Sequence, residues 1–176
     1  KDGSGQELLY TTTDGSLISE CDWSYDGSKI ALKTNDLHGY NSKIIIIDML
    51  GNTLKTILSD ANGASGGLNF SVDGNYLVYC HDVSGYQDDH YRQLDSHIFL
   101  YNLTTNTARD LSVESEKENG TNDLDPRLSP NNSQIIFTNT SNDGISVKNI
   151  MVISISSDTE SERASLFSNG EMPDWE

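Results

Sequence analysis

One arrangement of apolar and polar residues occurs three times along the chain and predicts three β-hairpins. Each copy has a large apolar residue, a serine, a short polar turn, and then a run rich in β-branched and aromatic residues. The turn residues are Gly, Asn and Asp, which best tolerate the positive φ of a tight turn, and two strands joined in this way form a hairpin. The copies span residues 22–32, 69–79 and 127–137.

A second pair of strands is predicted after each hairpin. The third strand of the first unit, 43–49, is a continuous apolar run, which is typical of a strand buried on both faces. A flanking strand is predicted at 6–12. Residues 172–176 are interpreted as the first residues of a further unit, because Asp174-Trp175 matches Asp22-Trp23. The complete four-strand units are expected at about 21–58, 68–112 and 126–167.

The spacing of these units predicts a β-propeller. Equivalent apolar positions are Trp23, Phe70, Leu128 and Trp175, separated by 47, 58 and 47 residues. Four strands in a repeat of roughly 40–50 residues make one propeller blade. A β-sandwich built from the same hairpins is the alternative. The constant position of the turns favours the propeller, and the chain is expected to be all-β.

The hairpin resembles the WD40-like PD40 repeat, Pro-x-Trp-Ser-Pro-Asp-Gly-x-x-Ile-x-Phe. Residues 22–31 carry the fullest match, and 125–130 and 173–175 match its opening. The resemblance implies a TolB-like propeller, a fold also found in propellers of peptidases and oligogalacturonate lyases. In the third copy, Leu128 replaces the aromatic residue and Asn131-Asn132 replaces Asp-Gly. We therefore expect the third blade to be the loosest.

Three blades cannot close a ring, since four is about the smallest number known, and TolB-type rings resemble six. Two explanations remain open. Two chains join head to tail, each supplying half of a six-bladed ring around a two-fold axis, or the sequence belongs to a longer polypeptide. We favour the homodimer.

Charge limits the classes of partner. The formal net charge is −16, with 27 Asp and Glu against 11 Lys and Arg. Such a surface repels phosphate backbones and anionic membranes, so no nucleic acid is expected, and a cationic partner or a divalent cation is favoured. No apolar run approaches the ~20 residues of a membrane span. The start at Lys1, without methionine or signal peptide, is expected of a mature or truncated product, and the resemblance to TolB implies a periplasmic or secreted location.

The long connections are expected to form the functional face, because binding residues concentrate on loops carried by a rigid scaffold. In a propeller, the loops 35–41, 81–95 and 139–147 share one rim with the connections between blades. We expect a non-catalytic binding or scaffold module that docks a protein, peptide or glycan there. The predicted contact residues are Tyr40, Tyr86, Asp88, Asp89, Tyr91 and Asp95.

The alternative hypothesis is a metal-assisted polysaccharide lyase or hydrolase. Carboxylates and imidazoles on the rim would suit Mn²⁺ or Zn²⁺, and oligogalacturonate lyases hold a metal with rim histidines, although none of their motifs is matched. A solvated acidic loop is the simpler interpretation, so no cofactor and no catalytic residue are assigned. The acidic segment 122–125 lacks the EF-hand pattern, which favours a capping role for Asp125 over a Ca²⁺ site. The candidate metal ligands are His81, Asp88, Asp89, His90 and His97.

Overall fold

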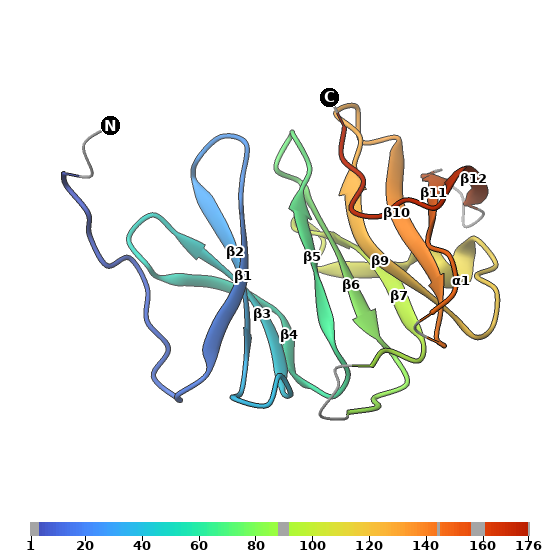
Figure 1. The fold of residues 1–176 in the computed structure, drawn as a ribbon. Helices are drawn as coiled ribbons and strands as arrows, with labels where there is room; N and C mark the ends of the chain where they lie inside the picture. Colours follow the sequence, from blue (N-terminus) through green and yellow to red (C-terminus); the bar gives the residue numbers. More distant parts are fainter. Residues whose placement is uncertain (1–3, 88–91, 144, 156–160, 176) are drawn as a thin grey trace.

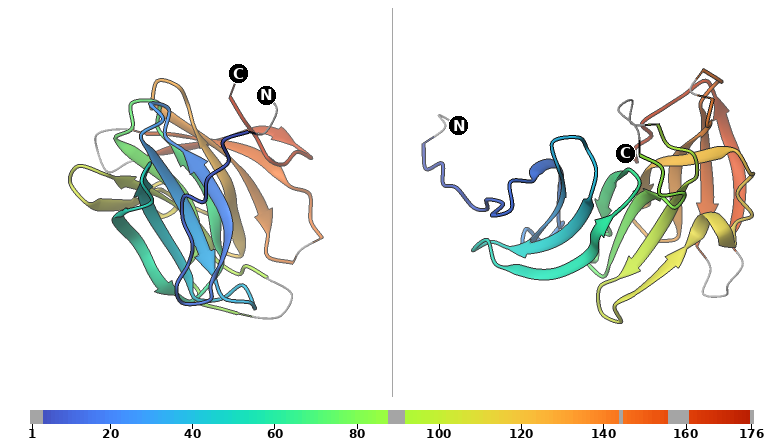
Figure 2. Two further views of the ribbon diagram at one scale, coloured as in Figure 1. Left: turned by 90° about the vertical axis from the view of Figure 1, so that its left-hand side faces the viewer. Right: turned by 90° about the horizontal axis from the view of Figure 1, so that it is seen from below.

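The computed structural model of the protein describes residues 4–87, 92–143, 145–155 and 161–175. These residues form three sheets of four antiparallel strands and one short helix (Figure 1). Each sheet follows the order of its strands in the chain, and the sheets stand side by side along an arc (Figure 2). The prediction of an all-β chain with three four-stranded blades is confirmed.

The blades follow one another in chain order. Blade 1 contains β1 (Leu17–Trp23), β2 (Lys29–Asn35), β3 (Ser42–Asp48) and β4 (Thr53–Ala61). Blade 2 contains β5 (Ser65–Phe70), β6 (Tyr76–Asp82), β7 (Ser96–Asn102) and β8 (Thr107–Asp110), and helix α1 (Leu111–Glu114) follows it. Blade 3 contains β9 (Thr121–Leu128), β10 (Gln134–Ser141), β11 (Asn149–Ser154) and β12 (Glu162–Ser168).

A buried serine closes the first hairpin of every blade. The Ser71 hydroxyl donates to Asp73 Oδ1 at 2.7 Å and accepts the Tyr76 N–H at 2.9 Å. Ser24 and Ser129 make the same two bonds one blade earlier and one blade later. In the third turn Asn132 takes φ 58°, close to the 69° of Gly74. This turn keeps the same hydrogen bonds although it departs from Asp-Gly, and the looseness of the third blade stays a prediction.

The hydrophobic core lies between the blades, since each middle strand sends alternate side chains to opposite neighbours. Leu77 and Tyr79 of β6 pack with Ile44 and Ile46 of blade 1. Val78, between them in the sequence, packs with the cluster that contains Phe137 of blade 3. Burial on both faces explains why β3 reads as a continuous apolar run.

Three expectations about the connections are corrected. Residues 6–12 form no strand, because no described segment pairs with them; instead Leu9 and Tyr10 pack against Leu32, Ile45 and Ile47 at the outer face of blade 1. The first strand of blade 1 begins earlier than predicted, at Leu17. The stretch 113–125, which separates the expected second and third units, includes the end of α1 and the start of β9. Asp110 caps this helix by accepting the Val113 N–H at 3.0 Å.

The long connections gather on one side of the molecule, opposite the first hairpin turns (Figure 1). Hydrogen bonds join the long loops of blades 2 and 3 to connections between blades. The Asp82 N–H donates to the Ala64 carbonyl at 2.8 Å, and the Asn142 N–H donates to the Gly120 carbonyl at 3.0 Å. We call this side the long-loop rim.

Candidate functional site

An acidic hollow of about 540 Å³ opens on the long-loop rim of blade 1. Lys43 lies in it, with Nζ 3.1 Å from Asp14 and 3.6 Å from Asp60. Leu37, which is 75% exposed, adds an apolar surface. The lining residues are Asp14, Gly15, Ser16, Asp36, Leu37, His38, Asn41, Lys43 and Asp60. The hollow thus combines three carboxylates with one ammonium group.

Local hydrogen bonds keep two of these carboxylates ionised. The Ser16 hydroxyl and N–H, and then Lys43, hold the pKa of Asp14 below its usual range. The Tyr40 N–H, which donates to Asp36 Oδ1 at 2.9 Å, is the main cause that lowers the pKa of Asp36. Hydrogen bonding to a carboxylate favours its charged form. The hollow therefore stays negative over the physiological pH range.

Tyr40 belongs to the loop that forms one wall of this hollow. Its carbonyl accepts the Asp36 N–H at 2.9 Å, which closes the loop, and its ring stacks on His38 with centroids 6.2 Å apart. Tyr40, which was predicted as a contact residue of the rim, thus lies beside the acidic hollow. Sequence reasoning missed Asp14, Lys43 and Asp60, which come from distant positions in the chain.

Asp82 holds together the two ends of the long loop of blade 2. Its carboxylate, buried at 0% exposure, accepts the Ser84 N–H at 2.9 Å and the Leu94 N–H at 2.8 Å. Tyr86 is 40% exposed on this loop, and its N–H donates to the Ser84 hydroxyl at 3.1 Å. The predicted contact residues Asp88, Asp89 and Tyr91 lie outside the described residues, as does His90.

Asp95 is engaged in a charged cluster at the other end of this loop. Its Oδ1 lies 2.7 Å from Lys117 Nζ and 3.1 Å from His97 Nε2, while His97 Nδ1 lies 2.8 Å from Asp110 Oδ2. Burial opposes protonation of His97, but the hydrogen bond and charge of Asp110, with that of Asp95, raise its pKa. The Asp95 carboxylate is thus already partly neutralised by groups of the chain itself.

The two described candidate metal ligands have other partners. His81 and His97 face each other on β6 and β7. Both ring nitrogens of His97 lie against carboxylates, and His81 Nδ1 lies 2.8 Å from the Ser65 hydroxyl. Among the described residues, no three His, Cys, Asp or Glu side chains are placed to hold a metal ion. A site that includes Asp88, Asp89 and His90 stays a prediction.

The acidic segment 122–125 has a structural role that its sequence did not reveal. Asp123 is completely buried on β9 and pairs with the Arg163 guanidinium of β12. It also accepts the Ser112 hydroxyl at 2.6 Å and Asn139 Nδ2 at 2.8 Å. This carboxylate joins α1, β9, β10 and β12.

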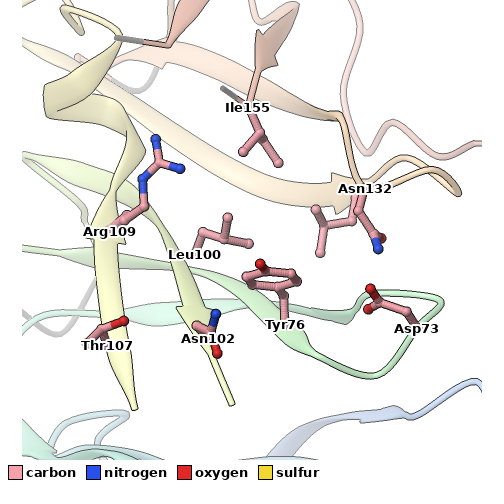
Figure 3. Close-up of a pocket in the computed structure, with 9 residues that line it drawn as sticks. Asp73, Tyr76, Leu100, Asn102, Thr107, Arg109, Asn132 and Ile155 are labelled. Carbon is pink, nitrogen blue, oxygen red and sulfur yellow. The ribbon is translucent and has the colours of Figure 1, made fainter. Parts of the chain in front are cut away.

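A second hollow, of about 350 Å³, lies between blades 2 and 3 on the side of the hairpin turns (Figure 3). Leu100, Leu128 and Ile155 give it an apolar floor. Arg109 lines it too, and its Nε donates to Glu114 Oε1 at 3.0 Å. Sequence reasoning had assigned no function to this side.

Comparisons with solved structures agree with the blade arrangement. TolB from Acinetobacter baumannii matches 84% of this chain at 21% identity, with a TM-score of 0.57. Prolyl oligopeptidase B from Galerina marginata matches 92% at 10% identity (TM-score 0.63), and a nidogen/laminin complex matches 88% at 14% identity (TM-score 0.59). The matches cover 32%, 24% and 49% of those chains, so this chain spans between about a quarter and a half of their lengths.

No protein-family model matches the sequence, and no curated protein sequence is similar to it. No helix in the described ranges has the length and apolar character needed to cross a membrane. At these identities the structural likeness establishes the fold alone. Together with the three sheets and their repeated serine turns, it shows that the chain has the β-propeller fold of structures such as TolB.

Proposed function

We propose that this chain is a non-catalytic binding module that docks a cationic segment of a protein or peptide on its long-loop rim. The observation that supports this function best is the hollow on blade 1, in which Asp14, Asp36 and Asp60 outnumber the single Lys43. Exposed Leu37 offers contact to the aliphatic stem of a lysine or arginine, which covers apolar surface while its charge stays hydrated.

Charge and scaffold both support this proposal. The net charge of −16 attracts cationic partners over long range and raises their association rate. Lys43 and Asp60 stand on β3 and β4, and hydrogen bonds to Asp36 close the loop beside them, so little ordering of the chain is needed on binding. A glycan, the other partner considered, would depend on tyrosines such as Tyr40 and Tyr86 rather than on carboxylates. We also propose a periplasmic or secreted location.

Fluorescence anisotropy tests this function. A labelled lysine-rich peptide is titrated with the protein, and the same peptide with each lysine replaced by glutamate serves as the ligand control. Asp14→Asn and Asp60→Asn should each weaken binding ~2- to 5-fold, the range of an exposed ion pair. Glu162→Gln, which removes one exposed charge from β12, should leave affinity unchanged. Equal affinity for both peptides would overturn the proposal.

The alternative, a metal-assisted lyase or hydrolase using His81, His90 and His97, has its own test. Calorimetric titration with Mn²⁺ and Zn²⁺ should reveal a stoichiometric site that His90→Ala abolishes, if this alternative is correct. Failure of both metals to bind would remove it and leave the docking proposal untouched.

A further inference from the structure

The third copy of the repeat departs from the other two at a residue that lines the second hollow. Where blades 1 and 2 have Gly27 and Gly74 in the first hairpin turn, blade 3 has Asn132, which takes a φ of 58°. A side chain at such a φ is disfavoured relative to glycine. The residue before it closes the turn, since Asn131 Oδ1 accepts the Ser129 hydroxyl at 2.8 Å. The hairpin therefore does not depend on the amide of Asn132.

One atom of this amide lacks a partner. Asn132 Oδ1 is buried, and within the described part of the chain it accepts no hydrogen bond. The same side chain donates to the Asp73 carboxylate of blade 2, and the two groups point toward each other at one end of the hollow (Figure 3). An unsatisfied buried acceptor costs free energy. A donor from a bound molecule would relieve this cost.

Asp73 makes this end of the hollow negative. Its carboxylate accepts the Ser71 hydroxyl at 2.7 Å and the Asn75 N–H at 3.0 Å, and both donors are neutral. Burial opposes ionisation, but these hydrogen bonds lower the pKa of Asp73. Arg109 lies at the other end (Figure 3), where its charge is balanced by its ion pair with Glu114. The charge of Asp73 therefore favours a cationic group in the hollow.

An apolar surface lies between the two ends. Leu100 and Leu128 are 5% and 7% exposed, and they form the floor together with Ile155. The ring of Tyr76 lies next to Leu100 (Figure 3). The volume of about 350 Å³ falls in the range of sites for small molecules. The hollow thus combines room for one apolar ring with a carboxylate and an unpaired acceptor.

We propose that the second hollow binds an arylalkylamine, a small molecule in which an apolar ring carries a primary amine. The ring lies on Leu100 and Tyr76, and the ammonium group donates to Asp73. Side chains commonly rotate on binding, and rotation of the Asn132 amide lets its Oδ1 accept from the same ammonium, which has three donors. This site lies on the side opposite the long-loop rim, and it goes beyond the docking function.

Titration of the isotopically labelled protein with phenethylamine, followed by nuclear magnetic resonance, tests the proposal. Phenethyl alcohol is the neutral control ligand of nearly the same shape. The amine should bind at millimolar concentration or below and shift the side-chain amide signals of Asn102 and Asn132, which line the hollow. The alcohol should bind ~2- to 5-fold more weakly, the range of an exposed ion pair. No binding of the amine at millimolar concentration, or equal affinity for both ligands, would overturn the proposal.

Substitutions in the turns separate the site from a general effect of charge. Asn132→Gly restores the glycine of the other two blades without straining the turn, and it should weaken binding of the amine ~5-fold or more because a hydrogen bond to a charged group is lost. Asp73→Asn should weaken it ~2- to 5-fold, and Asn131 shows that asparagine can close this turn. Asp26→Asn changes the equivalent residue of blade 1, away from the hollow, and should leave affinity unchanged. Unchanged affinity in Asn132→Gly, or equal losses in Asp26→Asn and Asp73→Asn, would overturn the proposal.

Discussion

Asp22 of blade 1 accepts the Phe70 N–H of blade 2 at 2.6 Å, and one blade later Asn69 accepts the Leu128 N–H at 2.9 Å. A carboxylate and an amide therefore perform the same task at equivalent positions. Burial raises the pKa of Asp22 although the Phe70 N–H acts in the opposite direction. The two joints provide an internal comparison of a charged and a neutral acceptor.

Removal of the acceptor at Asp22 should destabilise the protein. Asp22→Ala leaves the Phe70 N–H without its partner, and an unsatisfied buried donor costs about 1–3 kcal/mol. Asp22→Asn should cost clearly less, because Asn69 makes the equivalent bond. Urea unfolding followed by circular dichroism measures both variants. Equal losses for Ala and Asn would show that the hydrogen bond does not hold the two blades together.

The same pair predicts a dependence on pH. A carboxyl group whose pKa is raised by folding contributes stability that is fully present below its unfolded value, near 3.8, and is lost as pH rises through the folded value. As the pH rises above about 3.8, the free energy of unfolding of Asp22→Asn should therefore increase relative to that of the unaltered protein. The gain should level off once Asp22 is ionised in the folded state. If the stabilities of the two proteins changed in parallel across that pH range, the pKa of Asp22 would not be raised by folding.

In each blade, the buried serine of the hairpin turn should contribute to the free energy of unfolding. Ser71→Ala removes the acceptor of the Tyr76 N–H and should cost about 1–2 kcal/mol. Ser129→Ala should cost a similar amount, because its turn keeps the same bonds. Exposed Ser28 of the first turn gives the control, and Ser28→Ala should change stability by less than about 0.5 kcal/mol. A negligible effect at Ser129 would mean that the third hairpin is loose after all.

The buried pair of Asp123 and Arg163 should respond asymmetrically to substitution. Arg163→Met leaves a buried carboxylate without its cation and should cost about 3–5 kcal/mol. Asp123→Asn combined with Arg163→Met removes both charges and should recover part of that loss. Thermal unfolding of the single and double variants measures the difference. Additive losses would indicate that the two side chains are not coupled.

The sequence predicted those parts of the fold that depend on local chemistry. The Asp26-Gly27 and Asp73-Gly74 turns specify their hairpins through residue types that tolerate positive φ, and the structure confirms both hairpins. Residues 6–12 have the composition of a strand, but a strand also needs a neighbour, which no local pattern encodes. Helix α1 has only four residues, too few for a helical periodicity to be visible.

Less of the candidate site than of the fold could be predicted from the sequence. Tyr40 was predicted because its loop is long, and length is a local property. The hollow beside it depends on Lys43 meeting Asp14 and Asp60, which lie 29 and 17 positions away in the chain. Asp123 and Arg163 are 40 positions apart and belong to different strands of blade 3. Such pairs follow from the packing of the sheets, so no local sequence motif predicts them.

The most direct test of the docking function is the affinity of the lysine-rich peptide for the unaltered protein and for Asp14→Asn combined with Asp60→Asn, at low and at high salt. Attraction by the hollow predicts weaker binding to the double variant at low salt and a smaller loss of affinity with added salt, since screening acts on the charges that remain. Identical affinities and identical salt dependence for the two proteins would contradict the function proposed here.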